Sequence, residues 1–117
     1  MLTVQRGATP QLVASRAAVA GRWMDRAIGL LKYRRMPEGL ALIFPQCNSV
    51  HTVGMRFPID LIFVDRLWGV VRAEGEVAPG RLIFPVKGAW AVVEAAAGTI
   101  QRLGVAVGDV LRFMPQT

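Results

Sequence analysis

From Pro37 onward the chain is built of short apolar runs separated by Pro, Gly and Asp, and this pattern limits what it can fold into. Runs of this length suit β-strands and are too short for helices with a buried face. The expected strands are 40–44, 50–53, 59–64, 70–73, 82–84, 90–94 and 110–113. A hairpin loop is expected at 65–69, between two of them. The pattern predicts a mainly β fold.

One segment before Pro37 has a different period. Over 17–33 the apolar residues recur at helical spacing, at Val19, Trp23, Ala27, Leu30 and Leu31. We therefore expect one N-terminal helix packed against a compact antiparallel β barrel or sandwich of about six or seven short strands. Two smaller elements are also expected, a strand at 12–14 and a single helical turn at 100–103 that Thr99 caps and Gly104 ends.

The composition fits one folded domain over residues 1–117. With 117 residues, 53% of them hydrophobic, the chain has enough apolar material for one core. Cys47 is the one cysteine, so the fold needs no disulfide. No uncharged stretch is long enough to span a bilayer, and the first residues show no signal-peptide pattern. We expect a cytoplasmic protein without a membrane span; the sequence leaves its oligomeric state open.

The net charge of +6 is concentrated near the start of the chain. Residues 1–35 hold seven cations against one acid, Asp25, and the remainder is balanced. Such a segment is either the solvated face of a helix or a surface for an anionic partner. Nucleic-acid binding through this basic helix is one alternative, and it would be weak and salt-sensitive. No helix-turn-helix pair or RNP-like aromatic motif is visible.

The middle of the chain resembles a known family. The segment from Cys47 to Asp65 is similar to the central motif of the domain-of-unknown-function 192 family. Three shorter matches to the family are weaker: Gly29-Leu30-Leu31, Glu94 with Gly98, and Gly108-Asp109. With them, the resemblance covers about residues 12–114. This chain has His51-Thr52-Val53-Gly54-Met55 where many members have Trp-Met-Lys-Asn-Thr. The resemblance implies a compact mainly β fold and supplies no activity.

A polar site is expected around His51 and Asp60. Asp60 lies in an apolar run, so its carboxylate must find a cation, backbone donors or a cleft. The candidate partners are Arg26, Arg56 and His51. Gly54 permits a bend that would bring His51 and Asp60 together at one rim of the β structure, with Thr52 and Arg56 nearby. The alternative is that Asp60 is structural, in a salt bridge or binding a turn.

Other polar residues are expected to serve the fold. Glu94 follows an apolar run and is predicted to pair with an arginine of the expected helix, while Asp109 is predicted to cap a loop. Cys47 fits a small buried hydrophobe. Together with His51 it supplies only two soft ligands, so no metal site and no cofactor are expected.

These observations favour a small domain that binds a polar ligand or a peptide through His51, Thr52, Arg56 and Asp60. A second hypothesis is a small hydrolase-like enzyme that uses Asp60, His51 and Cys47. The third is the weak nucleic-acid binding described above. The sequence does not name the ligand.

Overall fold

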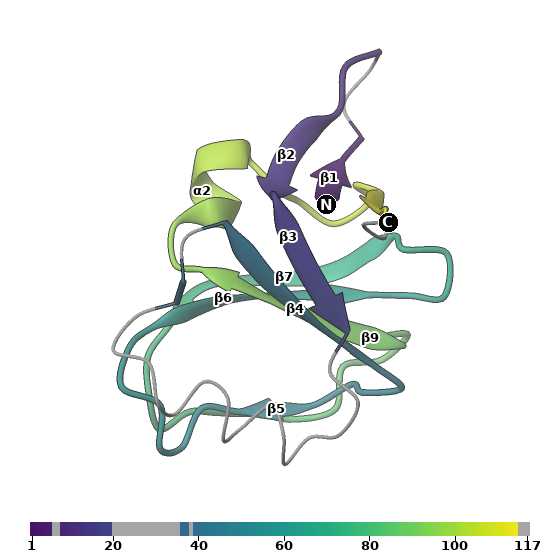
Figure 1. The fold of residues 1–117 in the computed structure, drawn as a ribbon. Coiled ribbons are helices and arrows are strands. Elements are labelled where there is room, and N and C mark those ends of the chain that lie inside the picture. Colours follow the sequence, from purple (N-terminus) through teal and green to yellow (C-terminus); the bar gives the residue numbers. More distant parts are fainter. Residues whose placement is uncertain (6–7, 20–35, 38, 115–117) are drawn as a thin grey trace.

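The fold consists of three layers, and the middle layer is a five-stranded central sheet. The computed structural model describes residues 1–5, 8–19, 36–37 and 39–114. Within them lie β1 (Leu2–Val4), β2 (Gln11–Ala14), β3 (Arg16–Val19), β4 (Leu40–Pro45), β5 (Val50–His51), β6 (Ile59–Val64), β7 (Val70–Val77), β8 (Leu82–Ile83), β9 (Ala91–Ala96), α2 (Thr99–Leu103) and β10 (Leu111–Phe113). Figure 1 shows the central sheet lying between β1, β2 and α2 on one side and β5 on the other.

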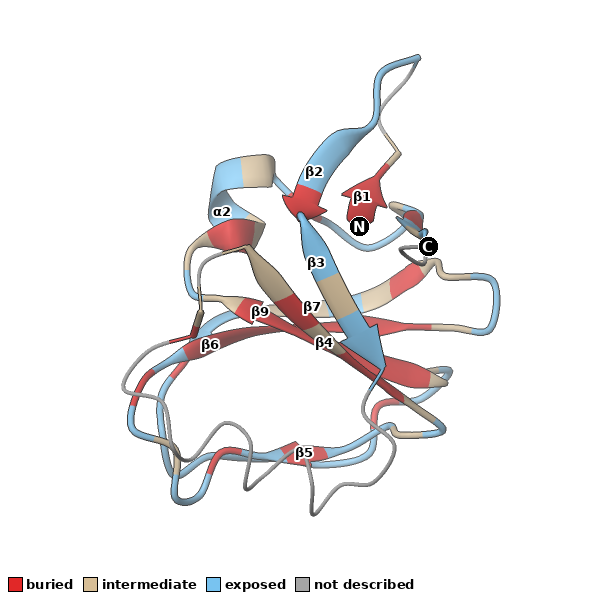
Figure 2. Ribbon diagram, viewed as in Figure 1, coloured by how far each residue is buried: buried red, intermediate tan, exposed pale blue. Residues whose placement is uncertain are grey.

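The central sheet has the strand order β3-β4-β9-β6-β7. Its pairs are antiparallel except β3 with β4, which is parallel. All six residues of β6 are buried, and β9 is buried from Ala91 to Ala95 (Figure 2). An antiparallel strand covered on one face alternates apolar and polar residues. Because both faces of this sheet are covered, 59–64 is instead an almost continuous apolar run.

Side chains of β6 alternate between two cores, one on each face of the sheet. Ile62 and Val64 belong to the core that also holds β1, the end of β2 and Leu111 of β10, with Ile100 and Leu103 of α2 packed against it. Leu61 and Phe63 belong to the core on the other face, where Val50 and Ile83 of the β5–β8 pair contribute. Apolar side chains on one face of the central sheet therefore pack against the three-stranded sheet β10-β1-β2, and those on the other face pack against the two-stranded β5–β8 ribbon.

The expected mainly β, compact fold is confirmed in its sandwich-like form. It is not a closed barrel, since β3 and β7 are the two separate edges of the central sheet. The strand at 59–64 has the predicted bounds. β7 continues to Val77, past the predicted end at 73, and its register with β6 shifts along the way. The parallel pair of β3 and β4 departs from the wholly antiparallel arrangement that we expected.

The start of the predicted N-terminal helix is wrong. Ala17 to Val19 belong to β3, in register with Ala41 to Ile43 of β4. Alanine has the highest helix propensity, but propensity is a weak preference, and pairing with a buried strand outweighs it. The rest of the predicted helix, 20–33, lies outside the described residues.

Helices that could cross a membrane are absent from the described part of the chain, where the one helix, α2, spans Thr99–Leu103.

Candidate functional site

Asp60 holds three segments of the chain together through backbone hydrogen bonds. It is fully buried in β6. Its Oδ1 accepts hydrogen bonds from the backbone N–H of Glu76, at 2.7 Å, and of Gly98, at 3.2 Å. Its Oδ2 accepts a hydrogen bond from the N–H of Ile100, at 2.7 Å. The donors belong to the end of β7 and to the start of α2, so one carboxylate fixes both segments to the central sheet.

This carboxylate takes the part that an N-cap side chain normally plays. The first N–H groups of a helix have no partner inside it, and a nearby side-chain oxygen usually accepts them. In α2 the N-cap is Gly98, which has no side chain to offer. Thr99, which we expected to be the cap, is the first helical residue, and its hydroxyl donates to the carbonyl of Ala96 at 2.7 Å. Asp60 therefore caps α2 from another element of the fold, because it lies in β6, 38 residues before Gly98 in the sequence.

Thr52 is also buried, and its hydroxyl connects two loops. Thr52 Oγ1 donates to the carbonyl oxygen of Ala78 at 2.7 Å and accepts from the N–H of Arg81 at 2.8 Å. Its backbone N–H donates to the carbonyl of Arg81 at 2.8 Å, and its carbonyl accepts from Gly80 at 2.9 Å. Thr52 is 1% exposed, so its hydroxyl braces the β5–β8 ribbon from within.

His51 lies on the outer side of that ribbon. Val50 pairs with Ile83 and His51 with Leu82, in antiparallel register. Val50 and Ile83 are buried against the sheet, so their strand neighbours point to the other side. His51 is accordingly exposed. Leu82 and Phe84 are exposed with it, at 61% and 78%.

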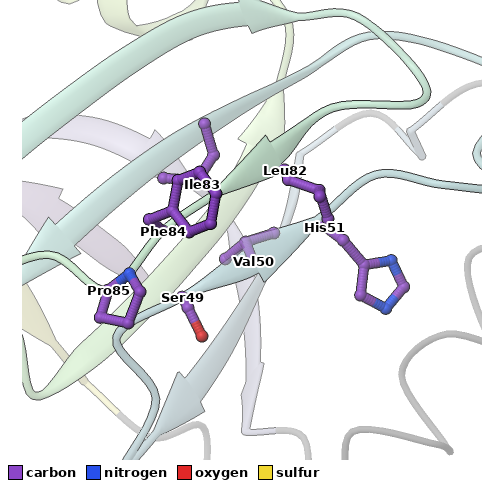
Figure 3. A pocket seen from close by; sticks show the side chains of 7 residues that line it. All are labelled: Ser49, Val50, His51, Leu82, Ile83, Phe84 and Pro85. Carbon is purple, nitrogen blue, oxygen red and sulfur yellow. The ribbon is translucent and has the colours of Figure 1, made fainter.

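An open hollow of about 240 Å³ lies at this ribbon. Figure 3 shows the imidazole of His51 at one end of the row of lining side chains and the ring of Pro85 at the other. Its lining residues are mostly apolar and come from both strands and their ends: Ser49, Val50, His51, Leu82, Ile83, Phe84 and Pro85. The apolar residues offer contact area, and His51 and Ser49 offer the polar groups that can orient a ligand.

The structure does not bring Asp60 and His51 together. The hydrogen bonds of Asp60 lead to α2 and β7, on the face of the sheet that carries α2. His51 stands on the outside of the ribbon that covers the opposite face. A turn does form within 51–56, closed by the N–H of Met55 on the carbonyl of Thr52 at 3.1 Å. It leaves Arg56 exposed rather than carrying it to Asp60. Whether any of these residues binds a ligand stays a prediction.

The remaining predicted residues do not line this hollow. The thiol of Cys47 donates to the carbonyl of Ser49 at 3.1 Å. Asp109 Oδ2 accepts from the N–H of Ala106 at 2.9 Å, which closes a loop as we expected. Glu94 is buried in β9, between Leu42 of β4 and Leu61 of β6. The helix arginines predicted to pair with it lie outside the described residues, as does Arg26, a candidate partner of Asp60.

Sequence reasoning missed Leu82 and Phe84 as site residues. Both lie in a short apolar run that predicts a strand, and a run of three residues does not show which side chains point outward. The available signal was that polar His51 follows apolar Val50, which indicates that His51 points outward. Residues paired across two strands lie on the same side, so the partner of His51 must point outward too.

Comparison with known proteins places the fold and the family. A crystal structure of a protein of unknown function from Novosphingobium aromaticivorans DSM 12444 is similar, with a TM-score of 0.75 at 22% identity over 96% of this chain and 83% of that one. Another, described as a "putative transcription regulator" from Sinorhizobium meliloti 1021, has a TM-score of 0.73 at 20% identity over 95% and 90%. No curated protein matches. The family model DUF192, described as "Uncharacterized ACR", matches residues 3–113, and the chain belongs to that family.

Proposed function

We propose that this chain is a peptide-binding module whose site is the outer side of the β5–β8 ribbon. The observation that carries this proposal is the pair of exposed side chains, Leu82 and Phe84, beside an exposed His51 at an open hollow. Apolar side chains gathered at a concave surface mark contact sites more often than single exposed ones do. The ribbon beneath them is held by buried Val50 and Ile83 and by the hydroxyl of Thr52, so the site is preformed.

The size of the hollow favours a peptide over a whole small molecule. Pockets that enclose drug-sized ligands have volumes of about 300–1,000 Å³. The hollow here, about 240 Å³ and open, suits one or two side chains of a longer ligand. Burying a side chain such as Leu or Phe contributes about 1.5–3 kcal/mol, and association carries a large entropic cost. Two such contacts contribute about 3–6 kcal/mol before that cost, so we expect weak binding, with a Kd of tens of micromolar or weaker.

The hydrolase hypothesis has less support. The carboxylate of Asp60 accepts from three backbone amides, the thiol of Cys47 donates to the carbonyl of Ser49, and His51 stands on the ribbon that covers the face of the sheet opposite Asp60. A nucleophile and its base need to lie within hydrogen-bond reach of each other. A single cysteine in the sequence suits a reducing compartment, so a cytoplasmic location is part of the proposal.

Nucleic-acid binding is kept as a second candidate function. It is supported by the basic excess in residues 1–35 and by the description of the Sinorhizobium meliloti protein. Binding of this kind would come from phosphate neutralisation, so it should weaken steeply with salt and ignore sequence. Fluorescence polarisation with labelled duplexes of two unrelated sequences, at two salt concentrations, tests it. Tight binding to one sequence at high salt would displace the peptide proposal.

The peptide proposal is tested with a phage-displayed library of random dodecapeptides, panned against the immobilised full chain. We expect enriched peptides that bind the wild type and lose at least fivefold in affinity on Phe84→Ser, about 1 kcal/mol of apolar contact. The matched control is Leu67→Ser, since Leu67 is 84% exposed on the β6–β7 hairpin, away from the ribbon. A library that yields no binders, or binders equally weakened by both variants, would refute the proposal.

A further inference from the structure

The β5–β8 ribbon lies in a part of the chain that carries only positive charge. We define the outer layer as residues 46–58 and 78–89, the two segments that contain β5 and β8. It contains Arg56, Arg81 and Lys87, all exposed, together with His51. Neither segment contains an Asp or a Glu, although the chain has eight acids in all. The outer layer therefore presents three cations that no acid of the same layer neutralises.

The central sheet, by contrast, carries acids as well as cations. On β7, Arg72 and Glu74 form an ion pair, with Nη2 2.6 Å from Oε1. On the central sheet, the buried acids are Asp60 and Glu94. The outer layer differs from the central sheet in carrying cations alone, and a partner docking there would meet positive charge beside apolar side chains.

In the sequence, Arg81 and Lys87 lie on either side of the segment 82–85 that lines the hollow. Arg81 follows Gly80 at the end where Thr52 ties the two segments together, next to Leu82 and His51. Arg56 belongs to the bend that starts at the same threonine. Lys87 belongs to the other end, in a turn closed by the N–H of Ala89 on the carbonyl of Val86 at 3.1 Å. The apolar residues Leu82 and Phe84 lie between these ends in the sequence and on the ribbon.

We propose that the partner is an acidic peptide segment, with an apolar side chain at its centre and aspartate or glutamate on both sides. This inference rests on the proposed function and specifies its ligand class. An extended segment of five residues spans about 17 Å, which suits a ribbon of this size. The apolar centre would occupy the hollow beside Phe84, and the flanking carboxylates would meet Arg81 and Lys87. Complementary charge at a rim raises the association rate and selects the partner.

An anionic lipid surface shares part of this chemistry, since it also pairs negative charge with apolar chains. The hollow favours the peptide, because a side chain of defined shape fills a concave site and a flat headgroup layer does not. The membrane is therefore an outcome of the test rather than the proposal.

The test uses the peptides enriched from the displayed library. We expect Asp and Glu to be enriched about threefold over the input library at positions flanking an apolar residue. For the best binder, a synthetic version with every acid changed to glutamine should bind at least tenfold more weakly at low salt, a difference of about 1.4 kcal/mol. That difference should shrink as salt rises, because exposed charges are screened.

Charge-reversal variants of the full chain complete the test. Arg81→Glu combined with Lys87→Glu should weaken binding of the acidic peptide about tenfold and leave binding of the glutamine version unchanged. The control is Arg102→Glu, an exposed cation on α2 at the opposite face of the central sheet, which should change neither. Circular dichroism checks folding, and Arg81→Gln with Lys87→Gln supplies a milder pair.

Three results would overturn the inference. Enriched peptides that are neutral or basic, yet still depend on Phe84, refute the acidic partner while the peptide-binding function stands. A library without binders refutes both. Binding to phosphatidylglycerol vesicles that Arg81→Glu with Lys87→Glu abolishes, without any acidic peptide bound, assigns the surface to a membrane instead.

Discussion

Replacing Asp60 is the sharpest test of how this fold is held together. In Asp60→Asn the side chain keeps its shape but has one carbonyl oxygen in place of two carboxylate oxygens. Oδ1 accepts from Glu76 and Gly98, and Oδ2 accepts from Ile100. An asparagine side chain would therefore place its NH₂ group opposite at least one backbone N–H. Two donors cannot form a hydrogen bond, so at least one bond is lost.

The expected magnitude follows from the number of bonds. A hydrogen bond to a charged group contributes about 1.5–3 kcal/mol, and a buried donor left unpaired costs about 1–3 kcal/mol. Asp60→Asn loses at least one such bond and the charge on the others, so we expect a loss of about 3 kcal/mol in the free energy of unfolding. Asp60→Ala loses all three bonds and should cost about 5 kcal/mol, a large part of the stability of a small domain.

Urea unfolding followed by tryptophan fluorescence measures both values. The matched control is Asp65→Asn: Asp65 Oδ1 accepts two backbone bonds, from Leu67 and Gly69 at 2.9 Å each, but in a hairpin loop that water reaches. Water can replace those bonds, so the control should cost about 1 kcal/mol or less. If Asp60→Asn proved no more costly than Asp65→Asn, the conclusion that Asp60 anchors β7 and α2 to the sheet would be wrong.

Four further outcomes are expected. Thr52→Val should cost about 1–3 kcal/mol and speed hydrogen exchange at the Arg81 amide, because the hydroxyl that accepts this N–H is gone; unchanged exchange would contradict the bracing role. Gly98→Ala should cost about 1–2 kcal/mol in urea unfolding, because Gly98 has a φ of 93°, and a cost near zero would argue against that backbone conformation. Ile62→Ala should cost about 2–5 kcal/mol, since Ile62 is fully buried, and a thermal melt that barely moves would contradict the three-layer packing. Phe84→Ser should change stability by less than about 0.5 kcal/mol, because the side chain is 78% exposed; marked destabilisation would show that Phe84 serves the fold rather than a partner.

The sequence was most informative where apolar runs have clear stops. The strand at 59–64 follows Pro58 and ends at Asp65, and the structure has the same bounds. β1 was missed because its pairing is non-local: Leu2 lies opposite Phe113, at the other end of the chain. A segment of three residues carries too little pattern to reveal such a partner. Residues 17–19 of β3 were predicted as helix because Val19 fits the helical spacing of the apolar residues after it, and the pairing of β3 with β4 is not visible in the sequence.

For the candidate site, the sequence indicated which groups need partners but not which partners they find. The run around Asp60 showed that a carboxylate would be enclosed, and burial makes hydrogen-bond partners obligatory. The donors that satisfy it come from Glu76, Gly98 and Ile100, which the fold brings from two other elements. His51 was found because histidine is rare and chemically distinctive in this chain. Leu82 and Phe84 resemble core residues in sequence, and only the ribbon's alternation reveals that they are exposed.

The pairing of β1 with β10 bears on how the chain reaches its folded state. β1 is the middle strand of its sheet, between β2 and β10, so the first strand of the chain cannot complete its hydrogen bonds until the last one has emerged from the ribosome. During synthesis, Leu2 and Val4, both fully buried in the finished fold, must wait with one edge unpaired. Unpaired edges invite association with other chains, and such distant pairings slow folding. Nascent chains stalled before residue 111 should therefore be more sensitive to proteases near β1 than chains released at full length.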